Sequence, residues 1–222
     1  MSKLLAAILT TIVLFQSQVG FGQTVLSNEM DSLSYAIGIN IGQSLRSQNI
    51  NPNTDLIKTA IADMLNSESL AMPEAQCSAF IQSYFQKAAD AVGNVNLKAG
   101  NDFLDKNKLR EGVITTESGL QYEILSAGIG AKPLASEKVK VHYHGTLIDG
   151  TVFDSSIERG SPATFGVTQV IQGWIEGLQL MPSGSKWKFF IPADLAYGSR
   201  GQGKIGPSSA LIFDVELIEI VK

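Results

Sequence analysis

The apolar residues in the first half of the chain recur with a period near four, which is typical of amphipathic α-helices. A first helix is predicted from about residue 27, and one apolar stripe runs along it, formed by Leu33, Ile37, Ile41 and Leu45. The segment Asn51-Pro52-Asn53 interrupts the pattern, and a second helix is expected from about Thr54. The inward face of that helix is predicted to be Leu56, Ile57, Ala60, Ile61, Met64 and Leu65.

A third and much longer helix is predicted to start at Pro73, because proline suits a first helical turn, where its missing N–H has no partner to lose. Its apolar face carries Cys77, Phe80, Ile81, Tyr84, Phe85, Ala88 and Val92. The helical pattern continues to about Leu109, and about 35 helical residues would span on the order of 50 Å. Gly93-Asn94 and Gly100-Asn101 are candidate kinks or breaks within it.

Two glycines lie one turn apart inside the first predicted helix, at Gly38 and Gly42. Each costs about 1 kcal/mol of helix stability relative to alanine. Close approach of a second helix would explain them, and simple tolerance is the alternative. Two short helices and one long helix do not enclose a core of their own, so two copies of the chain are expected to pair through this helical half.

From Gly119 the period of the apolar residues changes to two, which is typical of β-strands. Four alternating runs are predicted as strands: Leu120, Tyr122 and Ile124; Val139, Val141 and Tyr143; Trp187, Phe189 and Ile191; and Leu211, Phe213, Val215 and Leu217. Asp149-Gly150 predicts a hairpin turn, and one short helix is expected from about Trp174 to Leu180, ending at Met181-Pro182. The predicted fold class is therefore α+β: a curved antiparallel sheet wrapped on a short helix, preceded by an all-α domain.

The first 22 residues have the pattern of a secretory signal peptide. Lys3 gives a positive start, residues 4–15 are apolar or small, and Gly20 and Gly22 precede a plausible cleavage site before Gln23. A membrane anchor is the alternative, but the apolar core is short compared with the roughly 20 residues that a spanning helix needs. We therefore expect export and no stable membrane insertion after cleavage.

The charge of the chain argues against nucleic acids and anionic membrane surfaces as partners. The sequence has 17 basic and 21 acidic residues, and removal of the signal segment leaves 16 and 21, a net charge of −5. Cys77 is the single cysteine, so no intramolecular disulfide can form. It is expected to be buried on an apolar helix face, and a link between two subunits is the alternative.

The polar residues of the second half do not form a recognisable nucleophilic, metal or nucleotide site. His142 and His144 lack a third nitrogen or sulfur ligand, so a solvated strand face is the simpler interpretation. Ser155-Ser156 lacks a histidine-plus-acid pattern, and the loop at residues 198–206 lacks a phosphate-binding Lys-Ser/Thr pattern. We expect no metal and no cofactor, and the aromatic residues indicate a binding pocket instead.

Five segments carry these aromatic residues in a fixed order: VHYHGTL at 141–147, FDSS at 153–156, VIQGW at 170–174, ADLAYG at 193–198 and LIFDVEL at 211–217. This ordered set closely resembles the FKBP-type peptidyl-prolyl cis-trans isomerases over roughly residues 119–222. The whole layout is similar to the exported Mip-like and FkpA-like members, in which N-terminal helices make a dimer. The resemblance implies a signal peptide at 1–22, a helical dimerisation domain with a long linker helix at 23–110, and an isomerase domain at 111–222.

The resemblance also implies a proline-binding pocket. Its expected catalytic residues are Tyr143, Phe153, Asp154, Ile171, Trp174 and Tyr197, and its further substrate-binding residues are Phe165, Val170, Ile205 and Phe213. Trp174 is expected under the proline ring, and the Ile171 N–H and the Tyr197 hydroxyl are the expected donors to substrate carbonyls. Asp154 is expected near the pocket, hydrogen-bonded to Tyr143 or to the substrate amide.

Three positions leave alternatives open. Phe213 is also explained by strand packing, and Asp154 by a turn. Many family members have a second aromatic residue after the FDSS segment, whereas this chain has a shorter stretch at 161–165 with Ala163 at that place. Phe165 is expected to replace part of the wall, so the preference for the residue before proline and the affinity for macrolide inhibitors are open.

The function implied is acceleration of X–Pro isomerisation during the folding of exported proteins, in the periplasm or cell envelope, with chaperone activity as a homodimer. Its partners would be proline-containing unfolded or partly folded polypeptides. A non-catalytic chaperone or proline-docking module is the alternative, and no sequence feature specifically supports a surface virulence or adhesion factor. A site without base, nucleophile or metal can still be an enzyme here, because the barrier to be lowered comes from amide resonance.

Overall fold

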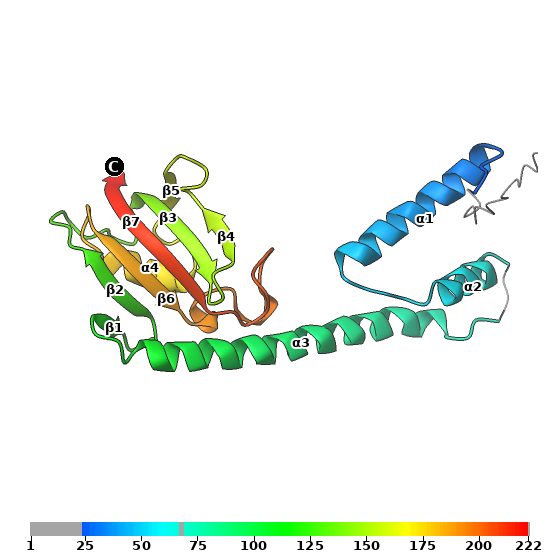
Figure 1. The fold of residues 1–222 in the computed structure, drawn as a ribbon, viewed down its shortest axis with the longest axis horizontal. Helices are drawn as coiled ribbons and strands as arrows, with labels where there is room; N and C mark the ends of the chain where they lie inside the picture. The colour runs from blue at the N-terminus through cyan, green and yellow to red at the C-terminus, as the bar shows by residue number, and fades with distance from the viewer. Residues whose placement is uncertain (1–23, 67–68, 222) are drawn as a thin grey trace, which may run out of the picture. The chain divides into compact units, whose positions relative to one another are not determined.

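The computed structural model describes residues 24–66 and 69–221, so the predicted signal segment lies outside the described residues. The chain divides into two compact units, Met1–Ala71 and Met72–Lys222. Figure 1 shows the helices of the first unit and the long helix and sheet of the second.

The first unit contains helices α1 (Glu29–Ser47) and α2 (Thr54–Leu65), so the predicted start of the second helix at Thr54 is confirmed. Asparagine side chains cap both helices: Asn28 accepts from the Asp31 N–H, and Asn53 accepts from two N–H groups of the first turn of α2. Neither helix contains a buried residue. The apolar stripe of α1 is open to solvent, with Leu33 and Ile37 53% and 51% exposed, and nothing lies within 4 Å of a side chain added at Gly38 or Gly42.

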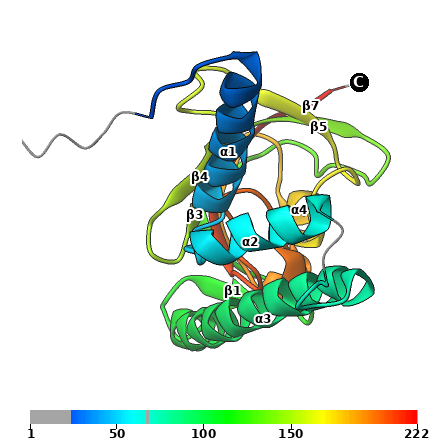
Figure 2. The same cartoon turned by 90° about the vertical axis from the view of Figure 1, so that its right-hand side faces the viewer.

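Helix α3 (Glu74–Asn107) begins the second unit. Pro73 occupies its N-cap position, one residue before the first turn predicted for it. Cys77 is half-buried on this helix and points its thiol at the Pro73 carbonyl (Sγ to O, 3.6 Å). The predicted breaks at Gly93 and Gly100 are wrong: α3 continues through both glycines (Figure 1 and Figure 2), and both are buried where the helix meets the sheet domain.

The second unit is built on an antiparallel sheet of seven strands in the order β1-β2-β6-β7-β3-β4, with β5 paired to β3. The strands are β1 (Val113–Thr115), β2 (Gln121–Ser126), β3 (Lys138–Leu147), β4 (Val152–Ser155), β5 (Ala163–Gly166), β6 (Lys186–Ile191) and β7 (Leu211–Val221). The sheet and its helix α4 (Gln172–Leu180) confirm the predicted α+β class. Two short 3₁₀ turns, η1 (Ala193–Leu195) and η2 (Gly198–Arg200), follow β6.

The Asp149-Gly150 turn joins β3 to β4, as predicted. Gly150 has φ +88°, a left-handed conformation that glycine adopts without steric cost. The Asp149 carboxylate accepts a hydrogen bond from the Thr151 N–H at 2.9 Å, which fixes the turn from inside. Strands β1 and β5 were not predicted; they have three and four residues, too few to show an alternating pattern.

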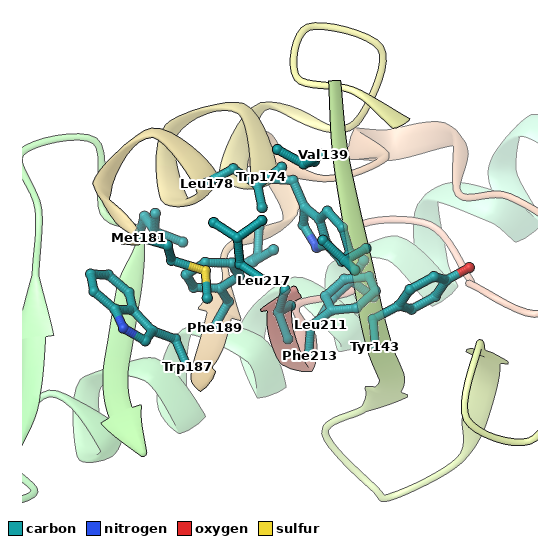
Figure 3. Close-up of a cluster of buried hydrophobic side chains, with 14 of the residues drawn as sticks. Val139, Tyr143, Trp174, Leu178, Met181, Trp187, Phe189, Leu211, Phe213 and Leu217 are labelled. Atoms are coloured by element: carbon teal, nitrogen blue, oxygen red, sulfur yellow. The ribbon is translucent and has the colours of Figure 1, made fainter. Parts of the chain in front are cut away.

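The core lies between α4 and one face of the sheet (Figure 3). Leu178 and Trp174 of α4 pack onto Phe189 and the apolar residues of β3 and β7. The helix approaches the strands closely because it has glycines on that side. A side-chain carbon added at Gly173 or Gly177 would lie 2.6 Å from Ile191 or Phe189. These close contacts fix the position of the α4 N-terminus, from which Trp174 projects.

The C-terminal half of α3 packs on the edge of the same sheet domain. Leu104 forms a small apolar cluster with Phe190 and Ala210. The buried Asn107 side chain donates to the Gln121 side chain at 2.8 Å, and Gln121 donates to the Leu104 carbonyl at 2.9 Å. Among the described helices, none combines the length and the apolar character needed to cross a membrane.

Candidate active site

One cavity of about 410 Å³ opens between the sheet, the start of α4 and the loop after η2. All ten predicted pocket residues line it: Tyr143, Phe153, Asp154, Phe165, Val170, Ile171, Trp174, Tyr197, Ile205 and Phe213. They come from four strands (β3, β4, β5 and β7), from helix α4 and from three loop segments, many of them far apart in the sequence. The structure therefore brings the predicted residues together, and the fold explains how each reaches the cavity.

Trp174 forms the centre of an aromatic cluster (Figure 3). Its indole is 3% exposed and meets the rings of Tyr143, Phe165 and Phe213 edge-on, with centroids 5.4, 6.0 and 5.2 Å away. Edge-to-face contacts are favourable arrangements for aromatic rings. The indole N–H finds no hydrogen-bond partner within the described part of the chain. The result is an apolar floor with fixed ring orientations.

Gly145 of β3 lies where the rings of Phe153 and Phe213 pack against the strand, and a larger residue would not fit there. A side-chain carbon at Gly145 would lie 2.7 Å from both Phe153 and Phe213, which stand edge-on to one another at 5.3 Å. Ile171 is the N-cap of α4 and has an extended backbone, which turns the chain so that Trp174 enters the first helical turn facing the sheet. Short-range geometry thus sets both the floor and one wall of the cavity.

A hydrogen-bonded trio of polar side chains lies at the rim. The Tyr143 hydroxyl donates to Asp154 Oδ2 at 2.5 Å, which agrees with one of the two predicted alternatives for Asp154. Arg159 Nη2 donates to the Tyr143 hydroxyl at 2.7 Å, and Arg159 Nη1 pairs with Asp154 Oδ1. The guanidinium also lies over the Tyr143 ring, 5.4 Å from its centroid. Sequence reasoning missed Arg159, a polar residue in a turn without any periodic pattern.

This trio fixes the charge of the carboxyl group. Burial alone would raise the pKa of Asp154, but the hydrogen bonds from Tyr143 and Arg159 and the charge of Arg159 outweigh burial and lower the pKa. The pKa of Tyr143 is raised, first by burial and then by its bond to Asp154. At neutral pH Asp154 is therefore a carboxylate with both oxygens engaged, and Tyr143 keeps its proton.

The two expected hydrogen-bond donors belong to residues that line the cavity, and neither has a competing partner within the described part of the chain. The Tyr197 hydroxyl makes no hydrogen bond to any described residue, and the Ile171 N–H donates to no described backbone carbonyl. Burial, followed by the negative charge of Asp154, raises the pKa of Tyr197, so its hydroxyl remains protonated. Both groups can donate to a carbonyl oxygen that enters the cavity.

Phe165 faces Trp174 from β5, whereas Ala163 pairs with Val141 on β3 at the edge of the core. The cavity is also lined by Gln169, Gln202, Gly203 and Lys204, which sequence reasoning missed because loop residues carry no period.

His142 and His144 are half-buried, and their Nδ1 atoms lie 3.1 and 3.0 Å from the hydroxyls of Ser156 and Ser155. Within residues 24–66 and 69–221, no three histidine, cysteine or acidic side chains are grouped so as to hold a metal ion.

Comparison with known proteins identifies the family. The profile of the FKBP-type peptidyl-prolyl cis-trans isomerases matches residues 130–218, and that of the domain amino terminal to these isomerases matches residues 30–124. The chain belongs to the FKBP-type peptidyl-prolyl isomerase family. The two matches follow one another along the chain, with the amino-terminal domain first.

Several full-length members are similar to this chain. Outer membrane protein MIP of Legionella longbeachae is 44% identical over 229 residues, covering 99% of this chain and 98% of the relative. The FKBP-type 22 kDa peptidyl-prolyl cis-trans isomerase of Escherichia coli K12 is 45% identical, covering 85% and 94%. The crystal structure of FkpA from Escherichia coli aligns with a TM-score of 0.63 at 32% identity, covering 88% of this chain and 98% of FkpA.

Proposed function

We propose that this isomerase binds proline-containing polypeptide segments in the aromatic cavity, with the proline ring against Trp174, and accelerates rotation about the X–Pro bond. One observation carries the proposal. Three rings stand edge-on around a buried indole at the base of an open cavity, and the same cavity is lined by Ile171 and Tyr197, whose N–H and hydroxyl have no partner among the described residues. An apolar ring fits the floor, while the carbonyl groups on either side of it fit the donors.

The chemistry of the reaction suits such a site. Rotation about an X–Pro bond has a barrier of roughly 18–20 kcal/mol, because the twisted amide loses its resonance. The planar amide is charge-separated and well solvated by water, whereas the twisted amide is less polar. The apolar aromatic floor, from which a bound proline ring displaces water, therefore favours the twisted state over the planar one.

The polar groups of the cavity contribute hydrogen bonds and a fixed field. The lowered pKa of Asp154 makes its carboxylate a poor proton acceptor, and its oxygens are already bonded to Tyr143 and Arg159. We therefore assign Asp154 an electrostatic role toward the substrate amide. Tyr197 and the Ile171 N–H are assigned as donors to substrate carbonyls. Phe153, Phe165, Val170, Ile205 and Phe213 complete the walls.

A protease-coupled assay on a short X–Pro peptide tests this function. The full chain lacking residues 1–22 should accelerate the slow cis-to-trans phase in proportion to enzyme concentration. A macrolide inhibitor, which we propose binds the same cavity, should suppress the acceleration. A slow phase with the uncatalysed rate at every enzyme concentration would contradict the proposal.

We further propose that the chain acts as a homodimer through its helical half, residues 23–110, with the isomerase domain at 111–222. The apolar faces of α1 and α3 support this, because Leu33, Ile37, Phe80 and Tyr84 are all more than half exposed within their own units. Soluble monomers rarely expose contiguous apolar patches above a few hundred Å². Two cavities in one dimer would raise the effective concentration of the site for a client with several prolines.

Export to the periplasm or cell envelope is the remaining part of the proposal. It rests on the signal-like pattern of residues 1–22 and on the similarity to a protein named as an outer membrane protein. N-terminal sequencing of the protein from a cell-envelope fraction tests it. A chain that begins at Gln23 is expected, and a chain retained in the cytoplasm with residues 1–22 intact would contradict it.

A further inference from the structure

One wall of the cavity is a loop held by a small number of hydrogen bonds, one of which joins the Ser208 N–H to the Gly198 carbonyl at 2.8 Å. Residues 201–209, the pocket loop, contribute Gln202, Gly203, Lys204 and Ile205 to the lining. Gly201 and Gly203 both have positive φ. Inside the loop, Gln202 and Ile205 exchange backbone hydrogen bonds of 2.8 and 2.9 Å. Ile205 is 6% exposed, so the loop must keep its position for this side chain to remain against the cavity.

Helix α3 supplies a hydrogen bond from outside the loop. Asn96 Nδ2 donates to the Pro207 carbonyl at 2.9 Å and lies 3.4 Å from Ser209 Oγ. Ser209 Oγ in turn donates to the Gly206 carbonyl at 2.9 Å. Asn96 is half-buried and lies 111 residues from Pro207 in the sequence. A residue of the long helix therefore holds the backbone two residues after Ile205.

The two glycines of α3 let the helix lie close enough for this bond. A side-chain carbon at Gly93 would lie 3.4 Å from Pro207, and one at Gly100 would lie 3.0 Å from Ala210. Positions 93, 96 and 100 are spaced i, i+3 and i+7, so they share one face of the helix. That face follows the end of the pocket loop, with Asn96 at its centre.

We propose that Asn96 is a positioning residue of the isomerase site: through Pro207 it holds the pocket loop in the conformation that binds substrate. This inference rests on the proposed use of the cavity for proline. When only a fraction of the molecules has the loop in place, apparent affinity falls in proportion to that fraction. Loss of the Asn96 bond therefore raises KM and leaves kcat unchanged, because the Trp174 floor and the Tyr197 donor belong to other elements.

The size of the effect follows from the hydrogen bond. A net contribution of about 1 kcal/mol corresponds to about a fivefold change in the equilibrium between held and released loop. Amide exchange of Gln202 and Ile205 should accelerate by about fivefold, and KM should rise by at most the same factor. The amides of β3 and β7 should keep their wild-type exchange rates.

The test uses the full mature chain with matched substitutions on one helix. Asn96→Asp keeps the shape but removes the N–H donor, and Asn96→Ala removes the donor without adding charge. Asn101→Asp makes the same chemical change at an exposed position of α3 and is the control. We expect both Asn96 variants to show the raised KM and the faster loop exchange, and Asn101→Asp to show neither.

An unchanged KM in both Asn96 variants overturns the proposal, whatever the loop exchange. A fall in kcat equal to the fall in kcat/KM, with KM unchanged, also overturns it. Failure of the underlying function has a different signature: the wild-type chain itself would then leave the peptide at its uncatalysed rate. In that case hydrogen exchange alone still reports whether Asn96 holds the loop.

Discussion

Tyr143 and Tyr197 line the same cavity, but of their two hydroxyl groups only that of Tyr143 has hydrogen-bond partners among the described residues. Removing each hydroxyl in turn therefore distinguishes a contribution to stability from a contribution to catalysis. Tyr143 is bonded to Asp154 and to Arg159, at 2.5 and 2.7 Å. Tyr197 has no hydrogen-bond partner within the described part of the chain. Tyr197→Phe should therefore lower isomerase activity without lowering stability, while Tyr143→Phe should lower the free energy of unfolding.

The magnitudes follow from the number and exposure of the bonds. A neutral hydrogen bond contributes about 0.5–1.5 kcal/mol, so loss of the Tyr197 donor should lower kcat/KM by about threefold to tenfold. Tyr143 donates to a carboxylate, which would give about 1.5–3 kcal/mol in a buried site. Asp154 is 45% exposed, so water can replace the lost donor and we expect a loss of about 1 kcal/mol. For a unit of about 150 residues this corresponds to a fall in Tm of about 2–4 °C.

Urea unfolding monitored by circular dichroism gives the free energies of unfolding, and the protease-coupled assay gives kcat/KM for the same preparations. Turnover of the peptide at the wild-type rate by Tyr197→Phe would refute the assignment of this hydroxyl as a donor to substrate. Destabilisation of Tyr197→Phe as large as that of Tyr143→Phe would also refute it, because the Tyr197 hydroxyl would then have an internal partner. Equal slopes of unfolding free energy against urea concentration would show that the variants unfold from the same native state.

Further outcomes can be measured on the same protein. The pKa of Asp154 is lowered and that of Tyr197 is raised, so kcat/KM should be constant between about pH 5 and 9; a bell-shaped profile inside this range would contradict the assigned protonation states. The pKa of Asp154 is lower in the folded protein than in the unfolded chain. The Asp154 carboxylate therefore stabilises the fold fully above the unfolded-state pKa, and this stabilisation is lost as the pH falls through the folded-state pKa. Light scattering of the mature chain should give the mass of two copies, and Ile41→Glu should give one; a single-chain mass for the wild type at micromolar concentration would refute the dimer. A fragment starting at Lys108 lacks the buried Leu104 side chain and the hydrogen bonds of Asn96 and Asn107, and it should lose at least roughly 2–3 kcal/mol of stability relative to one starting at residue 72; equal urea midpoints would argue against the packing of α3.

Much of the fold could be predicted because, in many segments, the local sequence pattern agrees with the element that the folded chain forms there. The Asp149-Gly150 turn, the alternating runs of β3, β6 and β7, and the short helix from Gln172 to Leu180 all lie where their patterns predict. The alternation is strong in these strands because one face packs on α4, whereas the other face is partly exposed except where residues such as Phe190 pack on α3. Strands β1 and β5 are too short for a period, and only their partners across the sheet define them.

The glycines of α3 show why some features could not be predicted from one sequence. A glycine inside a helix has the same local signal whether it marks a break or a close contact, because both cases need the absence of a side chain. Only the position of Ala210 beside Gly100, 110 residues later in the chain, distinguishes them. Arg159 was missed for a similar reason: its partners Tyr143 and Asp154 define its role, and nothing in its own segment does.

The packing of α3 on the sheet domain determines how much of this helix extends beyond the contact. The helix is held from Gly93 onward, which leaves residues 74–92 as a free length of about 28 Å at 1.5 Å per residue. A polypeptide that reaches from the start of α3 to the cavity must bridge most of that span. In an extended conformation this takes roughly eight or nine residues. Short peptides can therefore occupy the cavity without reaching the free end of α3, and only chains longer than this can extend from the cavity to that end.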